Sequence, residues 1–174
     1  MQALANGVTV LTYLYSDSHG DNTNCVIHIR YSDDYGATWS DKNKDLLGNS
    51  IANFPMYPPG GEPGTSELGP GDPHLILCDN GDLLLHMWKV KYGTEVWGTY
   101  QTRSTDDGIT WSTPTLIEFV GLSAAVNLRT FMTDDYFVYS GVIYAAARQY
   151  DDRFGSNCKS LFVKSTDNGA TWDY

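Results

Sequence analysis

The chain has 174 residues, of which 41% are hydrophobic and 13% aromatic, enough for a chain of about one domain to bury a core. Its 11 basic and 21 acidic residues give a formal net charge of −10, which argues against a broad nucleic-acid or anionic-membrane surface, because both require a basic footprint. No apolar run is long enough to predict a membrane span. The first seven residues also lack the charged and apolar regions of a signal peptide, and the compartment stays open.

The predicted elements are short strands in three similar units, because short apolar runs alternate with turn residues such as Asn6-Gly7 and Asn80-Gly81. In chain order we expect strands at 8–15 and 25–31, then at 75–78, 82–88, 96–103 and 115–120, and finally at 128–133, 142–150 and 159–164. This order predicts a four-stranded antiparallel meander in each unit of about 60 to 70 residues, as in a β-propeller blade.

One eight-residue motif, Ser-x-Asp-x-Gly-x-Thr-Trp, occurs three times, at 32–39, 104–111 and 165–172. Its aspartate can accept backbone N–H groups, its glycine supplies a positive φ, and its tryptophan covers the turn with apolar surface. Three equivalent copies favour a structural turn over the alternatives of calcium binding or catalysis. The structural residues are expected to be Asp34, Trp39, Asp106, Trp111, Asp167 and Trp172.

The three cysteines are expected to be small buried hydrophobes. The chain has no Cys-x-x-Cys or His-x-x-x-His spacing, so we expect no metal site and no cofactor.

The repeated motif resembles the Asp-box, or BNR repeat, of the sialidase (neuraminidase) superfamily, and the resemblance covers essentially the whole chain. It implies an all-β, sialidase-like β-propeller built of four-stranded antiparallel blades with Asp-box turns. The family architecture has six blades, so the chain would supply about half of a propeller. Asp-boxes also occur in non-catalytic propellers, and a fold alone does not assign chemistry.

The expected boundaries divide one partial propeller at 1–174 into three units. They are blade one at about 1–50 with an incomplete start, a crossover at 48–71, blade two at about 72–120, and blade three at about 121–174 without its last strand. Three blades leave two open sheet edges, and propellers avoid such edges by closing. We therefore expect a second copy, or another chain segment, to complete the propeller.

Strand direction places the Asp-boxes at one end of each blade and the candidate site loops at the other. These loops are 16–24, 48–73, 91–95, 121–127 and 151–157. In the sialidase-like family this second end is the active face. For individual acidic residues there, simple solvation is the alternative to a role in binding.

The resemblance implies an arginine cluster for the substrate carboxylate, a tyrosine nucleophile with a glutamate, and an acid/base aspartate. Arg148 lies seven residues after Gly141, as the family pattern requires, and Asp72 lies nine residues before Gly81. The catalytic candidates are Arg148, Arg129, Asp72, Tyr150 and Glu67. The substrate-binding candidates are Arg153, Asp151, Tyr92 and His19. Pairing of the arginines with neighbouring acids is the structural alternative, and the family's Arg-Ile-Pro signature is absent.

The function expected from this resemblance is a sialidase-like glycoside hydrolase domain, or half-propeller, that acts on glycans ending in an acidic sugar. If active, it would be an exo-sialidase-like enzyme, although the isolated chain is expected to lack the full catalytic set. The alternatives are a non-catalytic carbohydrate-binding or adhesive propeller and a structural assembly module. The expected partner is a glycan, with no nucleic acid.

Overall fold

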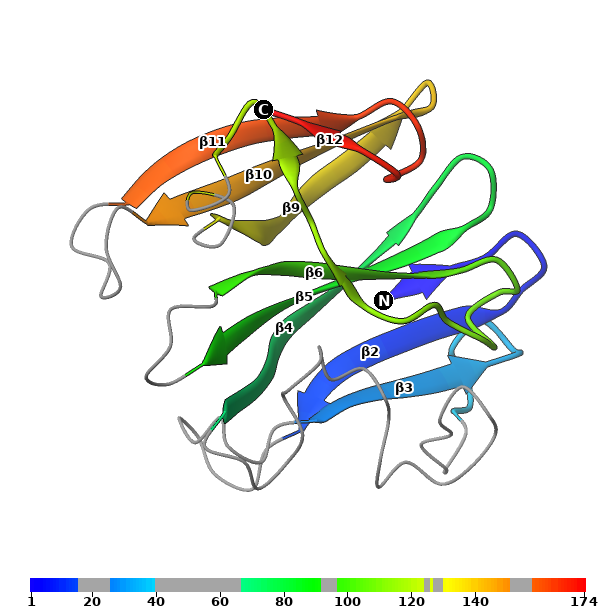
Figure 1. Cartoon of the computed structure of the whole chain (residues 1–174). Helices are drawn as coiled ribbons and strands as arrows, with labels where there is room; N and C mark the ends of the chain where they lie inside the picture. The colour runs from blue at the N-terminus through cyan, green and yellow to red at the C-terminus, as the bar shows by residue number, and fades with distance from the viewer. Residues whose placement is uncertain (16–25, 40–66, 92–96, 124–125, 127–129, 151–157) are drawn as a thin grey trace.

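The computed structural model describes residues 1–15, 26–39, 67–91, 97–123, 126, 130–150 and 158–174. Every element it gives in these residues is a β-strand, and the strands form three sheets. Figure 1 shows the sheets one above another in chain order, with the first at the bottom and the third at the top. The prediction of an all-β fold with antiparallel sheets is confirmed.

The strands follow the chain through each sheet with few exceptions. The first sheet contains β1 (Gln2–Ala3), β2 (Thr9–Tyr15) and β3 (Val26–Ser32). The middle sheet contains β4 (Glu67–Leu77), β5 (Leu83–Lys91), β6 (Trp97–Ser104) and β7 (Thr115–Leu116). The third sheet has the order β8 (Phe119–Val120), β12 (Trp172–Asp173), β11 (Cys158–Ser165), β10 (Val142–Tyr150) and β9 (Thr130–Tyr139).

Two hydrophobic cores lie on the two faces of the middle sheet. Leu83 and Leu85 of β5 pack into the core shared with the first sheet, and Leu84 packs into the core shared with the third. All three leucines are fully buried. A strand covered on both faces needs apolar residues in succession rather than in alternation. The consecutive leucines therefore mark the central position of this sheet.

The strands β1, β4 and β9, one from each sheet, meet at one place. The side-chain amide of Gln2 in β1 donates to the carbonyl oxygen of Leu75 in β4 at 2.9 Å. The same amide contacts the hydroxyl of Tyr136 in β9, which itself donates to the Leu75 carbonyl. These bonds tie together one strand from each of the three sheets, although the three segments are far apart in the sequence.

The segment 115–120, expected as one strand of the second unit, divides between two sheets. Its first part is β7, which pairs with β6, and its second part is β8, which pairs in parallel with β12 of the third sheet. Between them Ile117 donates its N–H to the carbonyl of Thr99 at 2.8 Å and buries its side chain in the second core. The chain passes from the middle sheet to the third sheet because Ile117 and Phe119 are buried between them.

The third unit also differs from its expected form. It was predicted to lack a last strand, but Trp172–Asp173 forms the short strand β12, which pairs with β11. Trp172 is 2% exposed, and its burial against the middle sheet draws this segment into the fold. Cys78 is buried as predicted, whereas the same prediction is wrong for Cys158, because that residue lies at the exposed start of β11.

Candidate functional site

The three motif turns, 32–39, 104–111 and 165–172, repeat one set of hydrogen bonds. The serine hydroxyl donates to the aspartate carboxylate at 2.6 to 2.8 Å and accepts the glycine N–H at 2.7 to 2.8 Å. The threonine N–H and hydroxyl donate to the two carboxylate oxygens at 2.6 to 2.8 Å. The bonds from Ser32, and next those from Thr38, lower the pKa of Asp34 to about 2. These carboxylates are held ionised by contacts within their own turns, which is a structural role.

The third motif turn also docks onto the middle sheet through a buried polar network. The Gln101 amide donates to the Gly169 carbonyl at 2.8 Å, and its oxygen accepts the indole N–H of Trp172 at 3.2 Å. His86 lies 2.9 Å from the same oxygen and packs edge-on against Trp172. Burial lowers the pKa of His86 to about 4, so its ring is neutral at pH 7. This network fixes the third sheet on the middle sheet.

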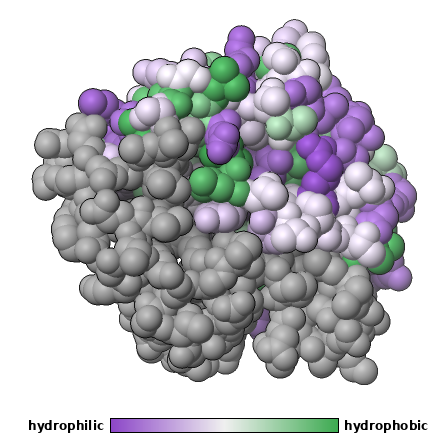
Figure 2. Space-filling view, viewed as in Figure 1, coloured by the Kyte–Doolittle hydropathy of each residue, from purple (hydrophilic) through white to green (hydrophobic). Residues whose placement is uncertain are grey.

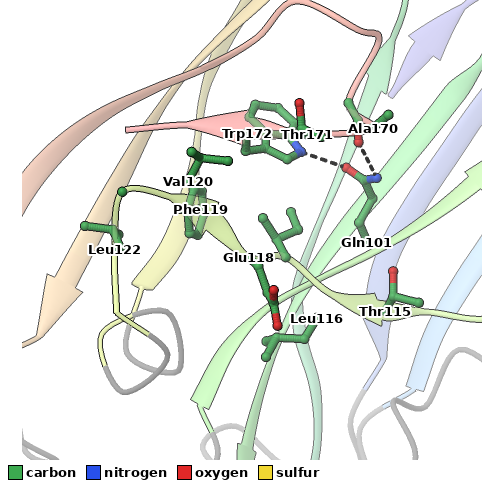
Figure 3. A pocket seen from close by; sticks show the side chains of 13 residues that line it. Gln101, Thr115, Leu116, Glu118, Phe119, Val120, Leu122, Ala170, Thr171 and Trp172 are labelled. Atoms are coloured by element: carbon green, nitrogen blue, oxygen red, sulfur yellow. Dashed lines mark hydrogen bonds between the residues drawn. The ribbon is translucent and has the colours of Figure 1, made fainter.

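A cleft of about 540 Å³ lies beside this network, lined by Gln101, residues 115–122 and residues 169–172. Figure 3 shows the Gln101 amide reaching toward Trp172 and the backbone near Ala170, while Glu118 stands apart from both. The polar groups that converge here are already paired with each other. The cleft is therefore a seam between the middle and third sheets, and of the predicted site loops only the start of 121–127 lines it.

The opposite end of the sheets, which we call the loop end, is where β4 and β9 begin and where β5 and β10 finish. There β4 departs from regular pairing with β5 between Gly71 and His74. Asp72 lies within this irregularity, is exposed, and has a left-handed φ of 41°. Such a φ is uncommon for a residue other than glycine, and β-bulges frequently redirect side chains beside active sites. The bulge presents a carboxylate at the loop end of the middle sheet's first strand.

Three aromatic side chains from different strands meet at the same end, and we call them the loop-end aromatic cluster: Trp88, Phe131 and Tyr150. The rings of Trp88 and Phe131 are 6.2 Å apart at 90°, and those of Phe131 and Tyr150 are 5.5 Å apart at 73°. Each is partly exposed. Trp88 pairs with Gly71, the residue before Asp72, so the cluster lies next to the bulge in β4.

The predicted arginine lies close to this cluster. Arg148 is exposed in β10, opposite Phe131 in β9 and Ser160 in β11. It shares one face of the strand with Tyr150, two residues later, while Ala147 faces the buried core. The structure therefore brings Arg148, Tyr150 and Asp72 to the same end of the sheets.

The remaining candidates are less completely placed. Glu67 begins β4 opposite Lys91, but its side chain lies outside what the structure describes, so its pairing with Tyr150 stays a prediction. Also outside the described residues are His19, Tyr92, Arg129, Asp151 and Arg153. In the part of the chain that is described, no cluster of three or more potential metal ligands occurs. No helix within the described ranges is long and apolar enough to cross a membrane.

Sequence reasoning missed Phe131, which connects Trp88 to Tyr150. An aromatic residue near the start of a strand is ordinarily assigned to packing, and its role depends on the register of β9 with β10. The contact of Trp88 in β5 with Phe131 in β9 joins the middle sheet to the third. The signal available in the sequence was a set of aromatic residues at strand ends.

Solved structures share the fold of this chain. A protein of unknown function from Dyadobacter fermentans is 18% identical with a TM-score of 0.65, over 99% of this chain and 51% of that one. A family 117 glycoside hydrolase from Zobellia galactanivorans is 17% identical with a TM-score of 0.63, over 98% of this chain and 52% of that one. A GH43 endo-arabinanase from Bacillus licheniformis is 17% identical with a TM-score of 0.53, over 96% and 51%.

Other similar structures include an exo-arabinanase and a polysaccharide lyase. At these identities the likeness shows the fold alone, and the chain spans about half the length of the first three structures. No protein-family model and no curated protein sequence matches the chain.

Proposed function

We propose that the chain supplies three blades of a glycan-active β-propeller whose substrate face is the loop end. The observation that carries this proposal is the bulge in β4 that presents Asp72 to solvent in a left-handed conformation. The meeting of Gln2, Leu75 and Tyr136 supports the propeller arrangement, because blades around an axis require one strand from each sheet to meet the others. The fold shared with glycoside hydrolases and polysaccharide lyases supports the substrate class.

Asp72 has the chemistry needed to cleave a glycosidic bond. Glycoside hydrolases generally use two carboxyl groups, one that protonates the leaving oxygen and another that acts as base or nucleophile. Asp72 supplies one such group at a position open to substrate. The second carboxyl group is assigned to another segment of the assembled propeller, in agreement with a chain that spans half of its structural neighbours.

The loop-end aromatic cluster supplies a surface for sugar rings. The faces of a sugar carry C–H groups that pack on aromatic side chains, while its hydroxyls seek polar partners. Trp88, three residues before the end of β5, and Tyr150, at the end of β10, are partly exposed. Arg148, on the same face of β10 as Tyr150, is placed to bind a carboxylate, which extends the proposal to glycans with an acidic sugar.

The test measures the new reducing sugar ends that the purified chain produces from an arabinan, an ulvan and a sialylated glycan. These substrates represent a neutral polymer, a uronic-acid polymer and a glycan with a terminal acidic sugar. Asp72→Asn should lower turnover of the accepted substrate by about 10²- to 10⁴-fold, as expected for loss of a general acid or base. Asn tolerates the left-handed conformation of Asp72, so the fold is preserved.

The matched control is Asp107→Asn, because Asp107 also has a left-handed φ, of 59°, but lies in the second motif turn at the other end of the sheets. Its turnover should equal that of the wild type. Equal activity of the Asp72→Asn variant and the wild type would remove Asp72 from the mechanism.

The second candidate function is glycan binding without catalysis, and the loop-end aromatic cluster favours it. Under this alternative no substrate is cleaved, but a glycan from the same panel binds, and Trp88→Ala weakens binding whereas Asp72→Asn does not. The comparison of Asp72→Asn with Trp88→Ala therefore separates the two functions.

A further inference from the structure

Each of the two later motif turns docks on the sheet before it. In both cases the contact is made by the residue directly before the motif serine of that preceding sheet. Tyr31, directly before the motif serine of the first sheet, donates its hydroxyl to the Gly108 carbonyl in the second turn. Arg103, directly before the motif serine of the middle sheet, donates to the Asn168 carbonyl in the third turn at 2.6 Å. A donor at this position therefore marks where the next motif turn rests.

The third sheet has the same position, occupied by Lys164 directly before Ser165 in β11. Lys164 is exposed and lies on the face of the sheet that points away from the middle sheet, opposite the face of buried Val163. It pairs with Tyr144 of β10. The described part of the chain contains no motif turn after the third to occupy this donor.

The surface around Lys164 is aromatic. We call it the outer face of the third sheet, and it consists of Phe137, Tyr144, Phe162 and Lys164. Tyr144 stacks on Phe137 at 4.9 Å and on Phe162 at 5.7 Å, while Phe137 and Phe162 are 56% and 61% exposed. Figure 2 shows hydrophobic residues interspersed with hydrophilic ones in the upper part of the view, where this sheet lies. Exposed aromatic rings in a row mark an interaction surface.

The first motif turn has the reciprocal property. Its Tyr35 has a left-handed φ of 57°, as Asp107 and Asn168 have at the same motif position, so the three turns share one backbone conformation. A Cβ added to Gly108 or Gly169 would meet side chains of the preceding sheet, but one added to Gly36 would meet only Trp39 of its own turn. Within the described residues, the first turn therefore rests on no preceding sheet.

We propose that the outer face of the third sheet receives the first motif turn, Ser32–Trp39, of a second copy of this chain. The contact continues the arrangement already present between the first and middle sheets and between the middle and third sheets. In it, Lys164 donates to a backbone carbonyl of the docked turn, and the aromatic rings pack beneath the turn. Among the described residues, the first motif turn and the outer face of the third sheet lack this contact, so a head-to-tail contact uses both, and two copies that exchange it close into a ring. The inference is independent of the glycan activity proposed above.

The test is sedimentation equilibrium of the purified wild-type chain, of which one copy weighs 19.3 kDa. The expected species has twice this mass. Lys164→Glu, which replaces the donor by an acceptor, should weaken association by about 10- to 100-fold, the effect of losing a charged hydrogen bond at an interface. Phe162→Glu should weaken association to a similar extent, because it places a charge among the aromatic rings of the outer face. Lys159→Glu, an equal charge change in β11 on the other face, should leave the mass unchanged.

A second variant tests the turn side of the contact. Gly36→Ala adds a methyl group at the motif position where, in the two docked turns, a Cβ would meet side chains of the preceding sheet. Its control is Gly81→Ala, because Gly81 has a nearly equal positive φ and nothing within 4 Å. Gly36→Ala should be monomeric, and Gly81→Ala should assemble. A mixture of Lys164→Glu and Gly36→Ala should sediment as a heavier species than either alone, because each copy retains the half that the other has lost.

A wild-type chain that remains a monomer would overturn the proposal, and so would an assembly that neither Lys164→Glu, Phe162→Glu nor Gly36→Ala weakens. Circular dichroism and thermal unfolding of every variant separate loss of assembly from loss of fold. Because the assay measures mass alone, its result does not depend on whether the chain cleaves a glycan.

Discussion

Gly169 occupies the point where the third motif turn presses on the middle sheet, and Gly169→Ala is the most demanding test of this packing. A Cβ at this position would lie 2.3 Å from Leu84 Cδ1 and 3.3 Å from Gln101 Oε1. Leu84 is fully buried, so its side chain has little room to withdraw. The backbone φ of +82° adds the cost of a left-handed alanine.

The two contributions set the expected magnitude. The left-handed conformation costs about 1–2 kcal/mol for a residue with a Cβ, and overpacking a buried site costs about 1–3 kcal/mol. Gly169→Ala should therefore lower the free energy of unfolding by about 2–5 kcal/mol. Gly81→Ala, with a φ of +90° and nothing within 4 Å, carries only the conformational cost.

The assay is urea unfolding of the wild type and both variants at one pH, followed by tryptophan fluorescence and circular dichroism. The difference between the two variants isolates the contact with Leu84 and Gln101. Equal destabilisation by Gly169→Ala and Gly81→Ala would refute the docking of the turn, because the close approach would then cost nothing.

Three further predictions concern the same turns and the core beneath them. The free energy of unfolding should fall as the pH drops from about 6.5 to about 4, by roughly 3 kcal/mol in total, because the pKa of His86 is about 4 in the fold and 6.5 when unfolded; pH-dependent denaturation should lose this component in a His86→Leu variant. The stabilising contribution of ionised Asp34 is complete above pH 3.8 and is lost as the pH falls toward 2, so Asp34→Asn should flatten the stability curve in that range. Trp172→Phe should cost about 1–3 kcal/mol in thermal unfolding, because it removes the indole donor to Gln101 and leaves only His86 on that oxygen, and more than Trp111→Phe, since Trp111 is only partly buried; equal costs would contradict the unequal burial.

The motif turns and most strands were predictable because their signals are local. The repeated Ser, Asp, Gly and Thr residues bond within eight positions, and the strands follow short apolar runs. The crossing of the chain from β7 to β8 was not predictable, since it depends on burial of Ile117 and Phe119 between two sheets. Local patterns carry no information about which sheet a two-residue strand joins.

The candidate site was predictable in position more than in detail. Strand direction predicted a loop at 48–73 that includes Asp72, whereas Asp72 lies within β4; Arg148 and Tyr150 lie at the end of β10, where the predicted strand 142–150 also ends. The left-handed backbone of Asp72 and the contact of Tyr150 with Phe131 follow from β-bulges and cross-strand register. Neither leaves a mark in composition or spacing, because both arise from pairing between segments distant in the sequence.

Under the proposed function, glycans bind at the loop end and not at the end with the motif turns. The most direct measurement is backbone hydrogen exchange of the chain with and without a glycan that it binds. We expect slower exchange at residues 72–74, 88–91, 130–132 and 148–150, with no change in the motif turns at 104–111 and 165–172. Protection confined to the motif turns, or to the cleft beside Trp172, would contradict this expectation.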